Sequence, residues 1–206
     1  MSRPTMIAEV LRAARATGPV AVLPEGLVPA DAAEAYAVQL ALLDGAPVAG
    51  WKVTPKPPHA GALIPQSRLV VDGGQLPGDL STPEVEAEVA VIFARDLPPR
   101  AARYEEAEVL AACGGLCAAF EILQSRFIDR KAVPPLANLA DALSNGAFGL
   151  GKGTGETAAD WSGTELAGLT AILSRNGQVL EEKVGGFSTA QVVAQLVWLA
   201  NHASAQ

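Results

Sequence analysis

The chain is poor in the residues that build zinc sites and disulfide frameworks. Its 206 residues include two cysteines, two histidines and two methionines. A structural zinc site has four cysteine or histidine ligands, so Cys113 and Cys117 would need His59 and His202 to complete one. Both cysteines lie in an apolar stretch, and we expect buried free thiols because free cysteine is among the most buried residue types. The lack of a disulfide framework favours a reducing cytoplasm.

Charge and long apolar runs are also scarce. Charged residues make up 18% of the chain, below the usual quarter, and the formal net charge is -7. This acidic balance argues against a nucleic-acid partner, which requires a basic surface. No apolar run reaches the roughly 20 residues of a membrane span, and Arg12 and Arg15 interrupt any N-terminal signal-peptide pattern. Half of the residues are hydrophobic, which allows a sizeable core and favours burial between the subunits of a homo-oligomer.

Hydrophobic periodicity predicts helices towards both ends of the chain and strands between them. We expect helices over 5–17, 31–43, 104–112, 136–143 and 189–202, and strands over 48–53, 67–71, 85–94, 116–123, 169–175 and 179–184. Asn176-Gly177 separates the last two strands and is a strong hairpin signal. The predicted class is α+β with a mixed, largely antiparallel sheet. A helical N-terminal region, 1–46, and a β-rich region, 47–206, would form one compact unit.

The predicted strand 85–94 carries two neighbouring carboxylates. Side chains two residues apart on a strand point to the same face, so Glu86 and Glu88 should lie side by side. The apolar residues that follow suggest a central strand. Two adjacent carboxylates repel each other unless a pKa rises or a cation binds, and Mg²⁺ and Mn²⁺ prefer such oxygen ligands. The alternative is a solvated face without a metal.

A third carboxylate, Glu121, lies alone in the apolar stretch 116–123. An unpaired buried charge is destabilising by several kcal/mol, so Glu121 should join a functional site or pair with Arg126 or Arg130. Lys52 follows Gly50-Trp51 at the end of a short strand. Near a metal, a lysine can act as an acid or base, whereas the alternative is an exposed lysine at a strand end.

These segments in this order resemble the fumarylacetoacetate hydrolase superfamily, in its 2-keto-4-pentenoate hydratase and 4-oxalocrotonate decarboxylase branch. The matching stretches are 50–53, 83–90 with 95–98, 120–126 with Asp129, 139–141 running to Gly146 and Gly151, 176–179 and 197–201. The resemblance implies a β-sheet roll with an N-terminal helical region and a C-terminal helix. It assigns metal binding to Glu86, Glu88 and Glu121, and an active-site role to Lys52.

The resemblance also implies the chemistry. The expected activity is that of a Mg²⁺- or Mn²⁺-dependent lyase acting on a small 2-hydroxydienoate or 2-oxo acid in the degradation of aromatic compounds. A hydratase of the 2-keto-4-pentenoate type is the first expectation and a 2-oxo acid decarboxylase the second. Ser125, Arg126 and Asp141 lie in the matching stretches and are predicted to bind the substrate.

The sequence departs from the family pattern at two places. Family members have an aspartate in the loop after the lysine, whereas this chain has His59, which is either an acid–base group or a loop histidine without a role. Members also continue through further strands, whereas this chain ends at Gln206. The alternative function is therefore a non-catalytic paralogue, or a subunit whose site a partner completes.

Overall fold

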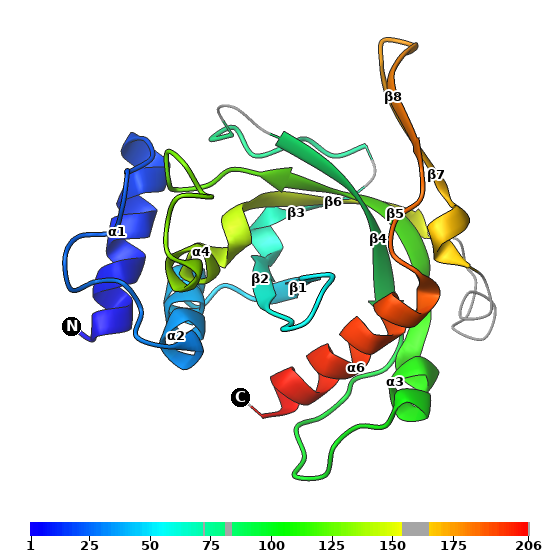
Figure 1. The fold of residues 1–206 in the computed structure, drawn as a ribbon, viewed down its shortest axis with the longest axis horizontal. Helices are drawn as coiled ribbons and strands as arrows, with labels where there is room; N and C mark the ends of the chain where they lie inside the picture. The colour runs from blue at the N-terminus through cyan, green and yellow to red at the C-terminus, as the bar shows by residue number, and fades with distance from the viewer. Residues whose placement is uncertain (72, 81–83, 154–164, 206) are drawn as a thin grey trace. The chain divides into compact units, whose positions relative to one another are not determined.

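A computed structural model describes residues 1–71, 73–80, 84–153 and 165–205. The fold is α+β, as predicted, with a helix at each end of the chain (Figure 1). The residues outside the described ranges include Pro83, which belongs to one of the family-like stretches. No helix among the described residues is both long and apolar enough to cross a membrane.

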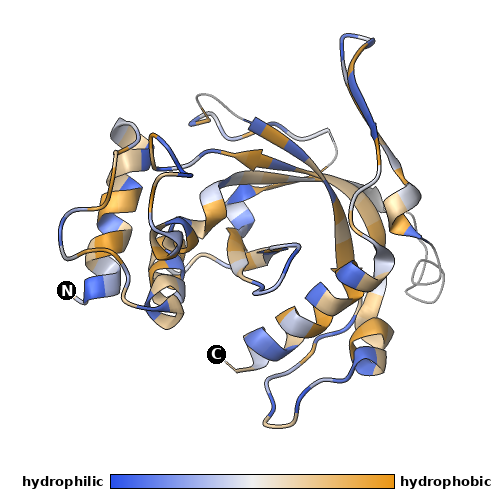
Figure 2. Ribbon diagram, in the orientation of Figure 1, coloured by the Kyte–Doolittle hydropathy of each residue, from blue (hydrophilic) through white to orange (hydrophobic). Residues whose placement is uncertain are grey.

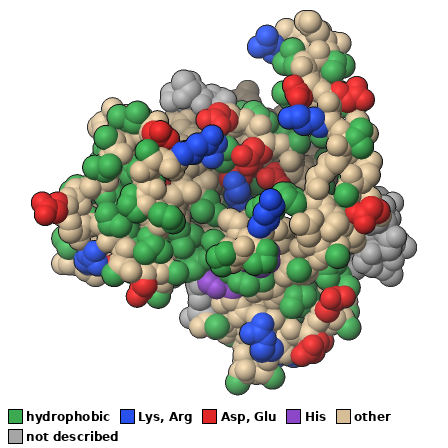
Figure 3. Space-filling view, in the orientation of Figure 1, with side chains coloured by type: hydrophobic (Ala, Val, Ile, Leu, Met, Phe, Trp, Pro, Cys, Tyr) green, Lys and Arg blue, Asp and Glu red, His purple; other side chains and the backbone are tan. Residues whose placement is uncertain are grey.

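Two N-terminal helices pack on each other and form one hydrophobic core. Helix α1 spans Arg3–Thr17 and α2 spans Ala32–Leu43, close to the predicted ranges. The side chains of Ser2 and Asp31 accept a hydrogen bond from the first turn of each helix, which explains where the helices begin. Polar and apolar residues alternate around α1 (Figure 2), and its buried face includes Ile7 and Leu11. Hydrophobic side chains are also frequent on the surface over α1 and α2 in Figure 3.

Strand β2 was missed by the sequence prediction and pairs with β1. The two strands span Gly61–Pro65 and Val48–Val53. Buried Gln39 of α2 donates hydrogen bonds to the carbonyls of Gly61 and Leu139, and its carbonyl oxygen accepts one from the Leu63 amide. This fully used side chain anchors β2 against α2, and it also attaches helix α4, Pro135–Ala140.

The site stands on a four-stranded sheet with the order β3-β6-β5-β4. Its strands are β3 Leu69–Val71, β6 Asn145–Gly153, β5 Cys113–Leu123 and β4 Glu84–Phe93. Strands β3 and β6 run parallel. The prediction that β4 is a central strand was wrong, because in the sheet of the described residues β4 lies at one edge. Its alternate side chains, including Val85 and Val89, are exposed on the face opposite the glutamates.

A second hydrophobic core gathers around helices α3 and α6. Helix α3 spans Glu106–Ala112, and α6 spans Thr189–Ser204 with a capping box at Ser188. Cys113 and Cys117 are buried free thiols, as expected. Helix α3 ends at Ala112, as predicted, but the strand that follows begins at Cys113, three residues before the predicted start at 116.

The predicted hairpin forms around Asn176-Gly177. Strands β7, Thr170–Arg175, and β8, Gln178–Val184, pair antiparallel, and every residue of both strands is exposed. The hairpin carries acidic and basic side chains (Figure 3) together with exposed Ile172 and Val179. The predicted homo-oligomer would give these apolar side chains a partner, and it stays a prediction.

The described chain divides into two compact units made of separate sequence stretches. One contains Met1–Lys52, Ala60–Glu88 and Ala119–Gly151; the other contains Val53–His59, Val89–Ala118 and Lys152–Gln206. The N-terminal helices therefore share a unit with part of the sheet. The division at residue 46 as a domain boundary stays a prediction.

Candidate metal centre

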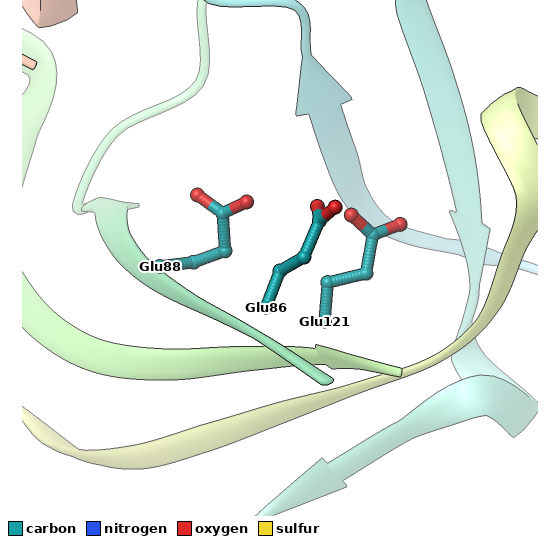
Figure 4. A group of neighbouring side chains, drawn as sticks. All are labelled: Glu86, Glu88 and Glu121. Atoms are coloured by element: carbon teal, nitrogen blue, oxygen red, sulfur yellow. The ribbon is translucent and has the colours of Figure 1, made fainter. Parts of the chain in front are cut away.

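Three glutamates meet on one side of strands β4 and β5. Glu86 and Glu88 project from the same face of β4, and Glu121 projects from β5 beside them (Figure 4). One carboxylate oxygen of each lies within 4.8 Å of the others. The period of two along β4 explains the first pair, and strand pairing brings the third carboxylate alongside. The structure thus brings together the three residues predicted as metal ligands.

Lys52 of β1 provides the positive charge at this cluster. Its ammonium group forms an ion pair with Glu121 Oε2, and Nζ lies 3.4 Å from Glu86 Oε2. The side chain of Glu121 is 0% exposed and that of Lys52 17% exposed, whereas that of Glu86 is 43% exposed. The cluster is therefore closed at Glu121 and open at Glu86, where a ligand from solvent can arrive.

Burial raises the free energy of the ionised carboxylates in this cluster. Burial, together with the charges of Glu121 and Glu86, raises the pKa of Glu88 to about 7 against the opposing effect of the Lys52 ammonium. Burial likewise raises the pKa of Glu121 against the opposing effects of Lys52 and Asn145. When all four groups are ionised, three negative charges face one positive charge. The surplus of two negative charges and the all-oxygen donor set both match a hard divalent cation.

Asn145, which the sequence analysis did not single out, holds Glu121 in place. Its side-chain amide donates a hydrogen bond of 3.0 Å to Glu121 Oε1. The next residue, Gly146, has no side chain, and a Cβ there would lie 2.9 Å from the Ile122 carbonyl oxygen. The glycine thus permits the close approach of β6 to β5 that brings the amide to the carboxylate. The sequence signal that could have identified Asn145 is its position as a polar residue just before the apolar stretch 147–150.

The three predicted substrate-binding residues form a buried network of their own. Arg126 pairs with Asp141 Oδ1 through Nε, and the Ser125 hydroxyl donates a hydrogen bond of 2.9 Å to Asp141 Oδ2. Arg126 Nη1 also donates to the Asn145 carbonyl at 2.7 Å. These bonds connect the end of β5 to the segment after α4. Their role in substrate binding stays a prediction.

Neither arginine considered as a partner for Glu121 pairs with it. Arg126 is engaged by Asp141, and Arg130 Nη2 lies 2.9 Å from Glu84 Oε2. Glu84 shares the parity of Glu86, yet its side chain is 68% exposed and lies outside the cluster. Glu121 therefore pairs with Lys52 and lies beside the other two glutamates.

His59, predicted as a second catalytic residue, belongs to the other compact unit. Its Nδ1 lies 2.9 Å from the Thr54 carbonyl oxygen, and its ring is tilted against Trp198 with 5.8 Å between centroids. These contacts fix the loop that follows β1 within that unit. The catalytic role of His59 stays a prediction.

Comparison with known proteins places this arrangement in a family. No family model matches the chain. The chain is 30% identical to 2-keto-4-pentenoate hydratase 2 of Dechloromonas aromatica (strain RCB) over 220 aligned positions, which cover 96% of the chain and 79% of that relative. The chain belongs to the hydratase and decarboxylase branch of the fumarylacetoacetate hydrolase superfamily.

Two solved structures of a protein in this branch share the fold. Both are 4-oxalocrotonate decarboxylase from Pseudomonas putida G7, one complexed with magnesium and adipate and the other with calcium and acetate. Their TM-scores are 0.75 and 0.73, their identities 20% and 21%, and each alignment covers 100% of this chain and 81% of the other. At this identity the likeness establishes the fumarylacetoacetate-hydrolase type of fold.

Proposed function

We propose that the chain is a divalent-metal-dependent lyase that acts on a small 2-hydroxydienoate or 2-oxo acid. Hydration of the 2-keto-4-pentenoate type is the favoured reaction, and decarboxylation is the alternative. The observation that carries this proposal is the cluster of Glu86, Glu88 and Glu121 with Lys52 beside it. The name of the hydratase relative supports the choice of reaction, and the magnesium and calcium in the two decarboxylase structures support the choice of cation.

The three glutamates would hold Mg²⁺ or Mn²⁺. The bound cation would act as a Lewis acid for the substrate's carboxylate and keto or enol oxygens. Glu121, oriented by Asn145 and removed from solvent, would provide the rigid side of the site. Glu86, which is partly exposed, would lie on the side where the substrate enters.

Lys52 is the group placed to move a proton. Its ammonium compensates Glu121 and Glu86. With a divalent cation held by those carboxylates, the ammonium at Nζ would donate a proton to the substrate and, as the amine, take one back. A side chain 17% exposed, and held by a strand, keeps that nitrogen at a fixed position.

The two candidate reactions make the same demand on these residues. Hydration adds the hydrogen and hydroxyl of one water molecule across a carbon–carbon double bond. Decarboxylation breaks a carbon–carbon bond, leaves the electron pair with the 2-oxo system as an enolate, and then returns a proton to carbon. Each reaction needs a proton moved beside an enolate, so the group with Lys52 serves either one.

The proposal is tested with the purified chain, magnesium and 2-hydroxypenta-2,4-dienoate. We expect the dienol absorbance to decrease with magnesium and to remain in EDTA. Glu88→Ala should slow the reaction at least about 100-fold, since it removes a carboxylate from the metal site itself. The matched control is Glu84→Gln, on the same strand but outside the cluster, which should react like the wild type.

Equal rates for the wild type and Glu88→Ala would contradict the proposed role. A thermal-shift titration with magnesium and oxalate separates binding from turnover. Stabilisation by magnesium, lost in Glu88→Ala, together with no turnover of any 2-hydroxydienoate or 2-oxo acid, would favour the non-catalytic alternative.

A further inference from the structure

Four arginines line a pocket of about 230 Å³ beside helix α1. We call it the arginine pocket, and its basic residues are Arg12, Arg15, Arg68 and Arg126. No acidic side chain lies among its lining residues, and neither Lys52 nor any glutamate of the metal centre does. The pocket is therefore a separate site with a strong positive character.

Three of the four guanidinium groups are neutralised by carboxylates outside the pocket lining. Arg12 pairs with Glu9, and Arg126 pairs with Asp141. Arg68 donates two hydrogen bonds of 2.6 Å, one to each carboxylate oxygen of Asp79. Each of these pairs neutralises one of the positive charges around the pocket.

In the described part of the chain, Arg15 is the one guanidinium of the four with no carboxylate within hydrogen-bond distance. Among the described residues it makes one hydrogen bond, from Nη2 to the Asn145 carbonyl at 3.2 Å. The nearest carboxylate oxygen, Asp79 Oδ2, is 3.7 Å from Nη1, beyond hydrogen-bond distance, and already accepts from Arg68. Most of the five donors of this side chain are thus free to bind a ligand.

The electrostatics agree with this geometry. Burial, together with repulsion from Arg126 and Arg68, lowers the pKa of Arg15 to about 10 against the attraction of Asp79 and Asp141. An anion in the pocket would relieve the repulsion among these cations. A second pocket of about 710 Å³ shares Arg15 and Arg126 and also contains Arg130 and Lys131, but unlike the arginine pocket it has carboxylates in its own lining, those of Asp79, Glu84 and Asp129.

We propose that the arginine pocket binds a small monocarboxylate with a short aliphatic chain, and that Arg15 is its main contact. One uncompensated guanidinium matches one negative charge, and the planar fork of arginine fits the two oxygens of a carboxylate. The other walls are largely apolar and include Leu11, Leu42 and Leu63. They would surround an alkyl chain of a few carbons, which a hydrated phosphate does not have.

Butyrate is the probe that tests this site. It is titrated by calorimetry into the full chain in EDTA at constant ionic strength, while the Nε–H signals of arginine are followed by NMR. We expect saturable binding that perturbs the Arg15 signal, and an affinity lower by about tenfold or more in Arg15→Gln. The matched control is Arg175→Gln on the exposed hairpin, which should bind like the wild type.

Two further variants keep the proposal falsifiable. Ser67 lies exposed on the pocket lining, so Ser67→Trp should block binding without removing a charge, even where Arg15→Gln fails to fold. Glu88→Gln should bind butyrate normally, which separates this site from the metal centre. Unchanged binding in both Arg15→Gln and Ser67→Trp would overturn the proposal. Tighter binding of inorganic phosphate than of butyrate would overturn the assignment to a monocarboxylate.

Discussion

Replacing Lys52 by methionine removes the cation that pairs with the glutamate cluster among the described residues, and it keeps a side chain of similar length. Glu121 then has no opposite charge, and its carboxylate is 0% exposed. Breaking a buried ion pair in this way typically destabilises a protein by about 3–5 kcal/mol. Because the Glu86 side of the cluster is open to solvent, we take the lower value, about 3 kcal/mol.

That loss corresponds to a melting temperature lower by about 6–12 °C for a chain of this size. The loss should depend on pH. A carboxylate whose pKa is raised in the folded state stabilises less as pH rises from its unfolded value towards the folded one. Removing Lys52 takes away the group that lowers the pKa of Glu88 and Glu121, so both pKa values rise further. The destabilisation is therefore expected to be greater at pH 8 than at pH 6.

The measurement is thermal unfolding in EDTA at both pH values, with Lys52→Arg as the control that keeps the charge. Magnesium should then restore more stability to Lys52→Met than to the wild type, because no ammonium competes with it for Glu121 and Glu86. If Lys52→Met and the wild type melt together in EDTA at pH 8, the account of the cluster as two surplus negative charges is wrong.

Two other predictions concern the same centre. Magnesium must displace the proton that Glu88 carries below its pKa of about 7. Calorimetry should therefore show weaker magnesium binding at pH 6 than at pH 8, a difference that shrinks in Glu88→Gln; an identical pH dependence in both proteins would contradict this. Asn145→Ala removes the amide that orients Glu121, so magnesium affinity should fall by about tenfold with the fold retained. The control is Asn138→Ala, at an asparagine whose side-chain oxygen lies 3.2 Å from the Ser144 hydroxyl. Equal magnesium affinities of Asn145→Ala and the wild type would show that the Asn145 amide has no positioning role.

Much of the candidate site was predictable because it depends on local rules. The alternation of strand β4 was enough to place Glu86 beside Glu88, and the apolar surroundings of Glu121 were enough to mark it as unusual. The meeting of Glu121 with Glu86 and Glu88 depends on the pairing of β4 with β5. Helix α3 lies between these two strands along the chain, so the sequence pattern alone does not show that they are neighbours. That Lys52 pairs with Glu121 also required the fold, since the partners expected from the sequence were Arg126 and Arg130.

The errors arise where tertiary contacts override local signals. Strand β2 was missed because 61–65 is short and ends in a proline, yet buried Gln39 supplies polar groups that fix its backbone. The predicted start of the strand over 116–123 was too late, because glycines 114 and 115 suggested a break between helix and strand. At Gly114 the strand passes Ala94 so closely that a Cβ would lie 2.7 Å from the Ala94 Cβ. A sequence pattern cannot distinguish a glycine that ends a strand from one that lets two strands approach.

The arrangement of buried charges explains why Glu121 is available to a metal at all. Arg126, five residues later on the chain, would neutralise Glu121 if it were free, but Asp141 engages it instead. Asn145 separates the two groups: its amide donates to Glu121, and its carbonyl accepts from Arg126 and Arg15. A neutral residue thus stands between a cluster with surplus negative charge and a pocket with surplus positive charge. Such a separation leaves one site suited to a cation and the other to an anion.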